Sequence, residues 1–172
     1  MKTIYTIGHS TRPIDQFIAL LSAHGISELV DVRTIPRSRH NPQFEGNALA
    51  ASLRQAGISY RHMPGLGGLR HARANSPNMG WENISFRGYA DYIATPEFSA
   101  ALDELKRLAE QRTVAIMCAE AVPWRCHRSL IADALTVQGW TVLHITSKKT
   151  ANPHELTPFL CVRDGTLTYP QT

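Results

Sequence analysis

The chain has 172 residues, a formal net charge of +4 at pH 7 and 43% hydrophobic residues. These values suit a single domain, residues 1–172, with its own hydrophobic core. Three cysteines are too few and too odd in number for a disulfide framework, which excludes a small disulfide-rich secreted protein and favours a reducing cytoplasm.

Strand and helix patterns alternate along the N-terminal half of the chain. A β-type run over residues 4–7 stops at a Gly-His-Ser sequence, where Ser10 or Thr11 is expected to cap the next helix. Apolar residues recur at helical spacing over residues 14–21, and Gly25 is expected to end that helix. The elements expected next are a strand at 29–32, a polar and basic loop at 34–42, a helix at 47–56 and a strand at 58–63.

The pattern is weakest over residues 64–88, where glycine, proline, asparagine and arginine are frequent. A loop of this length inside a compact domain is usually functional or mobile. Asp164-Gly165 favours a tight turn, so a hairpin is predicted over residues 159–169. The other elements expected in this half are a short helix at 89–94, a helix that begins at Thr95-Pro96, a strand at 113–118, a helix at about 125–138 and a strand at 140–145.

This alternation predicts an α/β fold: a single domain with a largely parallel sheet of about five strands, helices on both faces and a C-terminal β-hairpin. Ligands of such sheets bind outside the carboxyl ends of the strands. Chemically active side chains follow three of the predicted strands, which indicates one shared site. They are His9 and Ser10 after the first strand, Asp31 and Arg33 after the second, and Cys118 and Glu120 after the fourth.

The segment 117–128, MCAEAVPWRCHR, combines a thiol, a carboxylate, an imidazole and two guanidinium groups. We interpret Cys118 as a thiolate nucleophile or ligand, because nearby arginines and a helix N-terminus would lower its pKa, although Glu120 would oppose this. The alternative is a small buried residue. Cys126 is expected to face the core as a structural residue, with a resolving cysteine as the alternative. Cys161 is interpreted as structural.

The other polar residues of this segment each have two interpretations. His127 is either a hydrogen-bonded core histidine or an acid–base group for Cys118 or the ligand pocket. Arg125 and Arg128 lie three residues apart on one side of the expected helix start, either as a solvated or salt-bridged pair or as an anion clamp. A zinc site of Cys118, Cys126 and His127 would have no standard spacing and no evident fourth ligand, so we expect no metal.

Alternatives also remain open at the first two strand ends. His9, with Ser10, either caps the helix or lines the pocket. Asp31 and Arg33 are two residues apart in a strand and so project to the same face. They form a structural ion pair, or Asp31 orients Arg33 toward a ligand. Arg37 belongs to a basic loop that is either a solvated turn or a phosphate contact.

Six short motifs follow one another along nearly the whole chain. They are Gly8-His9-Ser10-Thr11, Asp31-Val32-Arg33, Pro36-Arg37-Ser38, Gly67-Gly68, Gly88-Tyr89-Ala90-Asp91-Tyr92 and Met117-Cys118-Ala119-Glu120 with Cys126-His127-Arg128. Together they resemble the uncharacterised family known as domain of unknown function 488, or DUF488. The resemblance implies a compact α/β protein of the bacterial or archaeal cytoplasm whose motif residues form a single site. It implies no particular cofactor.

The first functional hypothesis is an enzyme, a hydrolase or transferase that acts without a cofactor. Its substrate would carry phosphate, as a nucleotide or a nucleic-acid component does, in keeping with the mildly basic charge. Cys118 would be the nucleophile or redox thiol, and Glu120, His9 or His127 would move protons. The residues expected to bind substrate or phosphate are Ser10, Asp31, Arg33, Arg37, Arg125 and Arg128.

The second hypothesis is a non-catalytic nucleic-acid-binding module. The basic loop 37–40 and the segment 64–88 would supply the binding surface, with Trp81, Phe86 and Tyr89 available for stacking on bases. This hypothesis predicts strongly salt-dependent binding that does not need the cysteine thiol. A thiol-redox or metal-binding protein is a weaker third alternative. The N-terminal residues contain no long apolar stretch, so we expect no signal peptide, no membrane span and no membrane partner.

Overall fold

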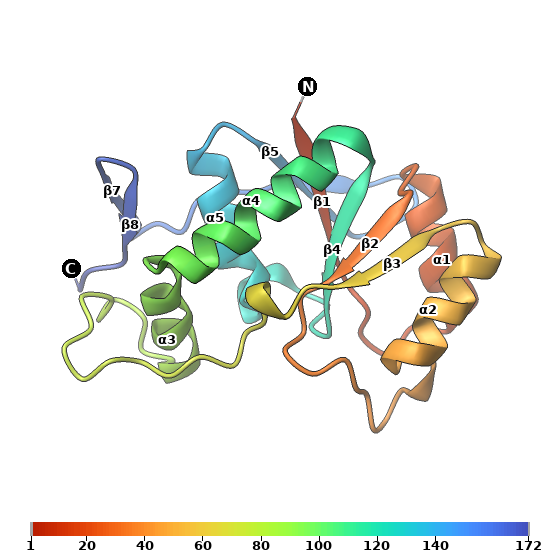
Figure 1. Cartoon of the computed structure of the whole chain (residues 1–172), viewed down its shortest axis with the longest axis horizontal. Helices are drawn as coiled ribbons and strands as arrows, with labels where there is room; N and C mark the ends of the chain where they lie inside the picture. Colours follow the sequence, from red (N-terminus) through yellow and green to blue (C-terminus); the bar gives the residue numbers. More distant parts are fainter. Residues whose placement is uncertain (1, 172) are drawn as a thin grey trace.

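A computed structural model describes residues 2–171 of the chain. The main strands are β1 (Thr3–Gly8), β2 (Glu28–Asp31), β3 (Ser59–His62), β4 (Val114–Cys118), β5 (Thr141–Ile145) and β6 (Ala151–Pro153). They form one sheet in the order β3-β2-β4-β1-β5-β6 (Figure 1). Strands β1 to β5 are parallel, and β6 pairs antiparallel with β5. The predicted α/β fold is confirmed, and β6 is a strand that the sequence did not predict.

Helices cover both faces of the sheet (Figure 1). They are α1 (Ile14–Ala23) and α2 (Gly46–Gln55) on one face, and α3 (Ile84–Ile93), α4 (Pro96–Gln111) and α5 (Arg128–Val137) on the other. Strand β4 is buried along its whole length, and its alternate side chains enter the two cores. Ile116 packs in the core under α3–α5, whereas Ala115 and Met117 pack under α1 and α2. Within residues 2–171, no helix combines the length and apolarity that crossing a membrane requires.

The sequence predicted the start of α4 correctly and the capping of α1 wrongly. Helix α4 begins at Thr95-Pro96 as predicted, and the Thr95 hydroxyl caps it by accepting a hydrogen bond from the backbone N–H of Phe98. The prediction for α1 was wrong, because Pro13 occupies the cap position and no side chain caps the helix. Ser10 instead adopts a positive φ of 50°, and its N–H donates to the carbonyl of Ala119. Short 3₁₀ turns lie at Pro42–Phe44, Pro64–Leu66 and Pro123–Arg125.

The segment 64–88 is ordered by contacts with α3, which begins earlier than expected because Asn83 caps it. The buried carboxylate of Asp91 accepts hydrogen bonds from the Ser76 hydroxyl at 2.5 Å and the Asn78 amide at 2.7 Å. Trp81 packs against Phe86, Phe159 and Tyr169 in an aromatic cluster. Tyr89 is fully buried, so the expectation that it is available for stacking on bases was wrong.

The C-terminal residues form the predicted hairpin, β7 (Cys161–Arg163) and β8 (Thr166–Thr168). Asp164 and Gly165 both have positive φ, as a tight turn of this kind requires. The hairpin is anchored by Asp133 of α5. This buried carboxylate accepts hydrogen bonds from His154 at 2.7 Å, from the Thr157 hydroxyl at 2.7 Å and from the Tyr169 hydroxyl at 2.8 Å.

Candidate functional site

The carboxyl ends of β1, β2 and β4 lie side by side, as predicted from the polar residues that follow them. Hydrogen bonds continue past the strands, from the N–H of His9 to the carbonyl of Cys118 at 2.9 Å and from the N–H of Val32 to the carbonyl of Met117 at 3.0 Å. A cleft of about 380 Å³ opens at this edge. The predicted site residues that line it are Arg33, Arg37, Cys118, Glu120, Arg125 and His127. Of the other predicted residues, the structure places His9, Asp31 and Arg128 in the buried layer of the protein.

A second cavity, of about 480 Å³, shares the 119–127 loop with this cleft. Pro123 and Trp124 face the larger cavity, whereas Arg125 and Cys126 face the cleft. Among the described residues, no cysteine or arginine lines the larger cavity, whose walls combine proline and aromatic residues with histidine, threonine and other polar residues. We therefore place the candidate site in the smaller cleft, where the sulfur atoms and the cationic groups meet.

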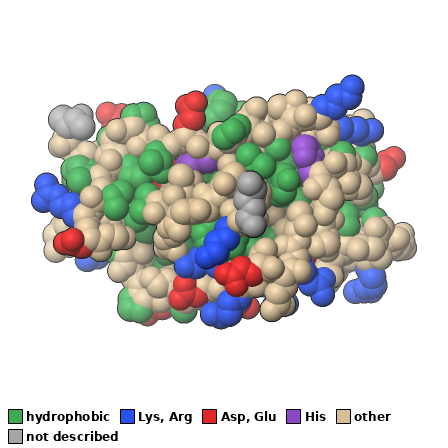
Figure 2. Space-filling model, turned by 90° about the horizontal axis from the view of Figure 1, so that it is seen from above, with side chains coloured by type: hydrophobic (Ala, Val, Ile, Leu, Met, Phe, Trp, Pro, Cys, Tyr) green, Lys and Arg blue, Asp and Glu red, His purple; other side chains and the backbone are tan. Residues whose placement is uncertain are grey.

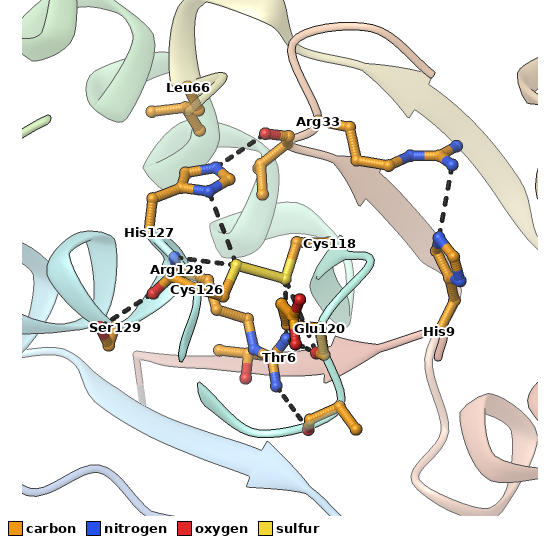
Figure 3. The surroundings of a disulfide bond; sticks show 12 residues. Thr6, His9, Arg33, Leu66, Cys118, Glu120, Cys126, His127, Arg128 and Ser129 are labelled. Atoms are coloured by element: carbon orange, nitrogen blue, oxygen red, sulfur yellow. Dashed lines mark hydrogen bonds between the residues drawn. A yellow bond between two sulfur atoms is a disulfide. The ribbon is translucent and has the colours of Figure 1, made fainter. Parts of the chain in front are cut away.

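Cys118 and Cys126 are joined as a disulfide (Figure 3). Both are nearly buried, and both line the cleft. Cys126 is buried in the core under α3–α5, as expected. The helix start expected at residue 125 was wrong, because α5 begins at Arg128 and Cys126 precedes it with an extended backbone. Among residues 2–171, Cys161 is the free cysteine.

Arg125 and Arg128 do not form a clamp, because the late start of α5 separates them. Arg125 is exposed at the cleft, whereas Arg128 is 1% exposed and its guanidinium group points to the interior of the loop. Nη1 of Arg128 donates to Cys118 Sγ at 2.8 Å and to the carbonyl of Glu120 at 2.5 Å. Nη2 donates to the carbonyl of Ala121 at 3.0 Å. Burial lowers the pKa of Arg128 to about 10.

His127 is the hydrogen-bonded histidine of the first interpretation, and its ring also lines the cleft. Its Nε2 lies 2.8 Å from the carbonyl of Val32, and a carbonyl can only accept, so Nε2 carries the proton of the neutral ring. Nδ1 is then unprotonated and lies 3.6 Å from Cys126 Sγ (Figure 3). Burial lowers the pKa of His127 to about 4, which keeps the ring neutral near pH 7.

Asp31 and Arg33 form the structural ion pair that was one of the two interpretations. Arg33 donates to the carboxylate through Nε at 2.9 Å and Nη2 at 2.7 Å, and both side chains are buried. The Tyr60 hydroxyl donates to the same carboxylate at 2.6 Å. The guanidinium fork of Arg33 is thus occupied by Asp31, which leaves Nη1 beside His9 Nε2 at 3.5 Å. Figure 3 shows this side chain extending toward His9.

His9 is a buried, neutral neighbour of the cleft. Its ring stacks on Phe44 with centroids 4.2 Å apart, and Nδ1 donates to the carbonyl of Ser10 at 2.8 Å. Burial lowers its pKa below the ordinary value. The position of His9 between Phe44 and Arg33 favours a supporting role over proton transfer to a ligand in the cleft.

Two glycines allow the backbone and rings of the site to approach closely. A Cβ at Gly8 would collide with the carbonyl of Glu120 and lie 2.8 Å from Arg128 Nη1. A Cβ at Gly68 would lie 2.6 Å from His127 Nδ1. A side chain at either position would displace a group that contacts the sulfur atoms, which explains why the motifs around them contain glycine.

Arg37 and Arg125 are the cations available to a ligand. Both are exposed, both line the cleft, and within residues 2–171 neither takes part in a salt bridge. Glu120 is exposed at the same edge. In the part of the chain that the structure describes, no three His, Cys, Asp or Glu side chains gather in a way that could hold a metal ion.

The lowered pKa values of His127, which is partly exposed at the cleft, and of buried His144 lead us to expect a loss of stability in acid. Burial lowers the pKa of His127 to about 4 and that of His144 to about 3, whereas both protonate near 6.5 when unfolded. Between those values the unfolded chain binds more protons, so stability is full above pH 6.5 and falls with falling pH. We expect the free energy of unfolding at about pH 5 to drop by about 2 kcal/mol for each of the two histidines.

Urea unfolding at several pH values measures this dependence. The dependence of the free energy of unfolding on pH should weaken in His144→Gln. It should persist in His71→Gln, a matched change at an exposed histidine. Equal stability at neutral pH and at about pH 5 would contradict the neutral state of these two rings in the folded protein.

The comparisons with known proteins agree with the motif pattern. The profile of the family described as "Domain of unknown function DUF488" matches residues 13–135, which include every residue of the cleft described above. No curated protein and no solved structure matches the chain. The match covers most of the 172 residues, and the chain therefore belongs to the DUF488 family.

Proposed function

We propose that the protein is a thiol-dependent oxidoreductase in which Cys118 and Cys126 cycle between a dithiol and a disulfide. The observation that carries the proposal is the bond between these two sulfurs at the wall of a cleft of about 380 Å³. In a reducing cytoplasm, where we place the protein, such disulfides are usually transient and serve catalysis or redox sensing. Two residues of the family motifs contact the sulfurs, Arg128 at Cys118 and His127 at Cys126, which supports a site for thiol–disulfide chemistry.

The proposed reaction is thiol–disulfide exchange. A thiolate of the pair attacks one sulfur of a substrate disulfide, forms a mixed disulfide and expels the other substrate sulfur as a thiolate. The second cysteine then attacks the mixed disulfide, loses its proton, closes the Cys118–Cys126 bond and releases the remaining substrate thiolate. Two external thiols then reduce the pair: the first forms a mixed disulfide, the second displaces it as an external disulfide, and both cysteine thiols are restored.

A redox equilibrium tests the proposal directly. The protein is equilibrated with mixtures of reduced and oxidised glutathione, quenched in acid, alkylated and analysed by mass spectrometry. We expect a reversible conversion in which Cys118 and Cys126 change together, while Cys161 remains a thiol or forms only mixed disulfides. A pair that stays reduced, or stays oxidised, across the whole range would contradict a cycling couple.

The cleft arginines predict a preference for anionic substrates. Arg37→Ala/Arg125→Ala should slow the oxidation of the reduced protein by glutathione disulfide about tenfold, because two exposed cations at the cleft are lost. Oxidation by uncharged hydroxyethyl disulfide should be unchanged. Stopped-flow tryptophan fluorescence measures both rates, and Arg54→Ala/Arg107→Ala is the control with equal charge loss on α2 and α4. Equal slowing with both disulfides would contradict the charge effect.

A second candidate is hydrolase or transferase chemistry on a phosphate-bearing substrate such as a nucleotide. It is favoured by the contact of Arg128 with Cys118 and by the free cations Arg37 and Arg125, in a cleft of the size that small ligands occupy. The Cys118 thiolate would attack phosphorus, the ester oxygen would leave with a proton, and water would later cleave the sulfur–phosphorus bond. This reaction does not use Cys126, so Cys126→Ser should retain hydrolysis of p-nitrophenyl phosphate.

The nucleic-acid-binding alternative has less support. Its stacking residue Tyr89 is buried, and Trp81 is engaged in the aromatic cluster. On the face drawn in Figure 2, basic side chains are dispersed among acidic and apolar ones and do not form one continuous patch. Salt-dependent binding of nucleic acid by Cys118→Ser would nevertheless restore this alternative.

A further inference from the structure

Beside the cleft, the guanidinium group of Arg128 is a buried cation without an anionic partner. It is almost completely buried, and within residues 2–171 it takes part in no salt bridge. Its Nε has no hydrogen-bond partner among the described residues. A buried cation without an anion is costly, because neutral carbonyls replace only part of its hydration.

The neighbouring ionisable groups do not remove this imbalance. Arg12 lies near enough to lower the pKa of Arg128, and the carboxylate of Glu120 raises it from outside salt-bridge distance. His144 of β5 also feels the charge of Arg128, and its ring is neutral because burial lowers its pKa to about 3. The ionisable atom in direct contact with the guanidinium group is Cys118 Sγ, at 2.8 Å.

Reduction of the disulfide supplies the missing anion. In the oxidised protein Cys118 Sγ carries no charge, whereas in the reduced protein it can ionise. A guanidinium group at hydrogen-bond distance favours the thiolate over the thiol, since it stabilises the charged form only. Cys118 is therefore the sulfur whose ionisation best balances the buried charge.

Cys126 has the opposite environment. Its Sγ faces Nδ1 of the neutral His127 ring, which can accept a proton but has none to donate. A hydrogen bond from the thiol to Nδ1 stabilises the protonated form. The backbone N–H of Arg128 lies 3.4 Å from the same sulfur and can donate a hydrogen bond to the negative charge that develops there as the proton leaves. The other charged or titratable groups near His127 are Arg70, Arg128 and Tyr89.

Building on the proposed function, we propose that the reduced site is an asymmetric pair, in which Cys118 is a thiolate paired with Arg128 and Cys126 is a thiol held by His127. Cys118 is then the attacking sulfur, and a substrate disulfide gives a mixed disulfide on Cys118 with release of one thiolate. Cys126 attacks Cys118 Sγ, and the Cys118–Cys126 bond forms as the second substrate sulfur leaves. The proton of Cys126 is relayed through Nδ1 of His127 to that leaving sulfur, which departs as a thiol.

Single-cysteine proteins test this asymmetry. Cys126→Ser/Cys161→Ser retains only Cys118, and Cys118→Ser/Cys161→Ser retains only Cys126. The ultraviolet absorbance of the thiolate is followed against pH, a readout that does not require access of a reagent to the buried sulfur. We expect Cys118 to ionise well below the ordinary thiol value of about 8.5, and Cys126 to ionise at or above it. Arg128→Gln in the Cys118 protein should move the midpoint up by at least one pH unit.

The comparison of the two single-cysteine proteins keeps Arg128 in place, so it decides the question even if Arg128→Gln fails to fold. Ionisation of Cys118 at or above about 8.5, or ionisation of Cys126 before Cys118, would overturn the asymmetric pair. The glutathione equilibrium of the wild-type protein separates this failure from that of the proposed function. A pair that cycles but ionises in the other order refutes only the inference, and a Cys118 thiolate in a pair that never cycles refutes only the oxidoreductase.

Discussion

Cys118→Ser is expected to slow the reaction of the cleft cysteines with glutathione disulfide by at least about a thousandfold, because the attacking sulfur is removed. Cys126→Ser should behave differently, since it leaves the attacking sulfur and removes the one that completes the reaction. That variant should take up one glutathione on Cys118 and stop there. Mass spectrometry of the intact protein and its peptides measures both outcomes.

Cys161→Ser is the control for these variants, because Cys161 lies in the C-terminal hairpin outside the cleft. It should react at the wild-type rate and release both glutathione thiols. Stable glutathione on Cys126 in the Cys118→Ser protein, formed at the wild-type rate, would reverse the assigned roles. Unchanged reactivity of both variants would contradict the dithiol mechanism.

Asp133→Ala is expected to be the most destabilising substitution outside the cleft. The change leaves His154, Thr157 and Tyr169 without their buried acceptor, and unpaired buried donors cost about 1–3 kcal/mol each. Some of these donors will find water once the C-terminal segment loosens. We therefore expect the free energy of unfolding to fall by about 4 kcal/mol.

Urea unfolding measures this loss, and hydrogen exchange locates it. Exchange should increase first in residues 154–169, which Asp133 fastens to α5. Asp103→Ala is the matched control, because Asp103 is an exposed helical aspartate whose salt bridge among residues 2–171 is with Lys106, also on α4. It should change the stability by less than about 0.5 kcal/mol. Equal effects of the two substitutions would show that the Asp133 network does not anchor the C-terminal segment.

The site could be located from the sequence because parallel strands carry their carboxyl ends to one edge of the sheet. Because polar residues follow three predicted strands, the sequence predicted that Arg33, Cys118 and Glu120 lie close together, and all three line the cleft. The family motifs pointed to the same residues. Helical periodicity also placed α2 and α4 closely, because both helices have one buried face.

The contacts of Cys126 and Arg128 with Cys118 could not be predicted, because they depend on where one helix begins. A 3₁₀ turn at Pro123–Arg125 and an extended residue at Cys126 interrupt the helical pattern before α5. The shift turns Arg128 inward and brings Cys126 to Cys118. Two signals were present in the sequence: Pro123 favours a turn ahead of a helix, and two cysteines flank that turn.

The Asp133 network was also missed, for a different reason. Its members are Asp133, His154, Thr157 and Tyr169, which come together only when the C-terminal segment folds back onto α5. No local spacing predicts that contact. Strand β6 lies in the same region and was missed because it is short, ends in Pro153 and sits at an edge of the sheet.

The most direct test of the account is a quenched-flow time course of wild-type reduced protein mixed with glutathione disulfide. Site-resolved mass spectrometry should detect glutathione first on Cys118 and then the Cys118–Cys126 disulfide, both faster than the reaction of free cysteine with the same reagent. Reaction of Cys118 no faster than that of free cysteine or Cys161, without closure of the disulfide, would contradict the claim that the cleft holds a catalytic redox pair.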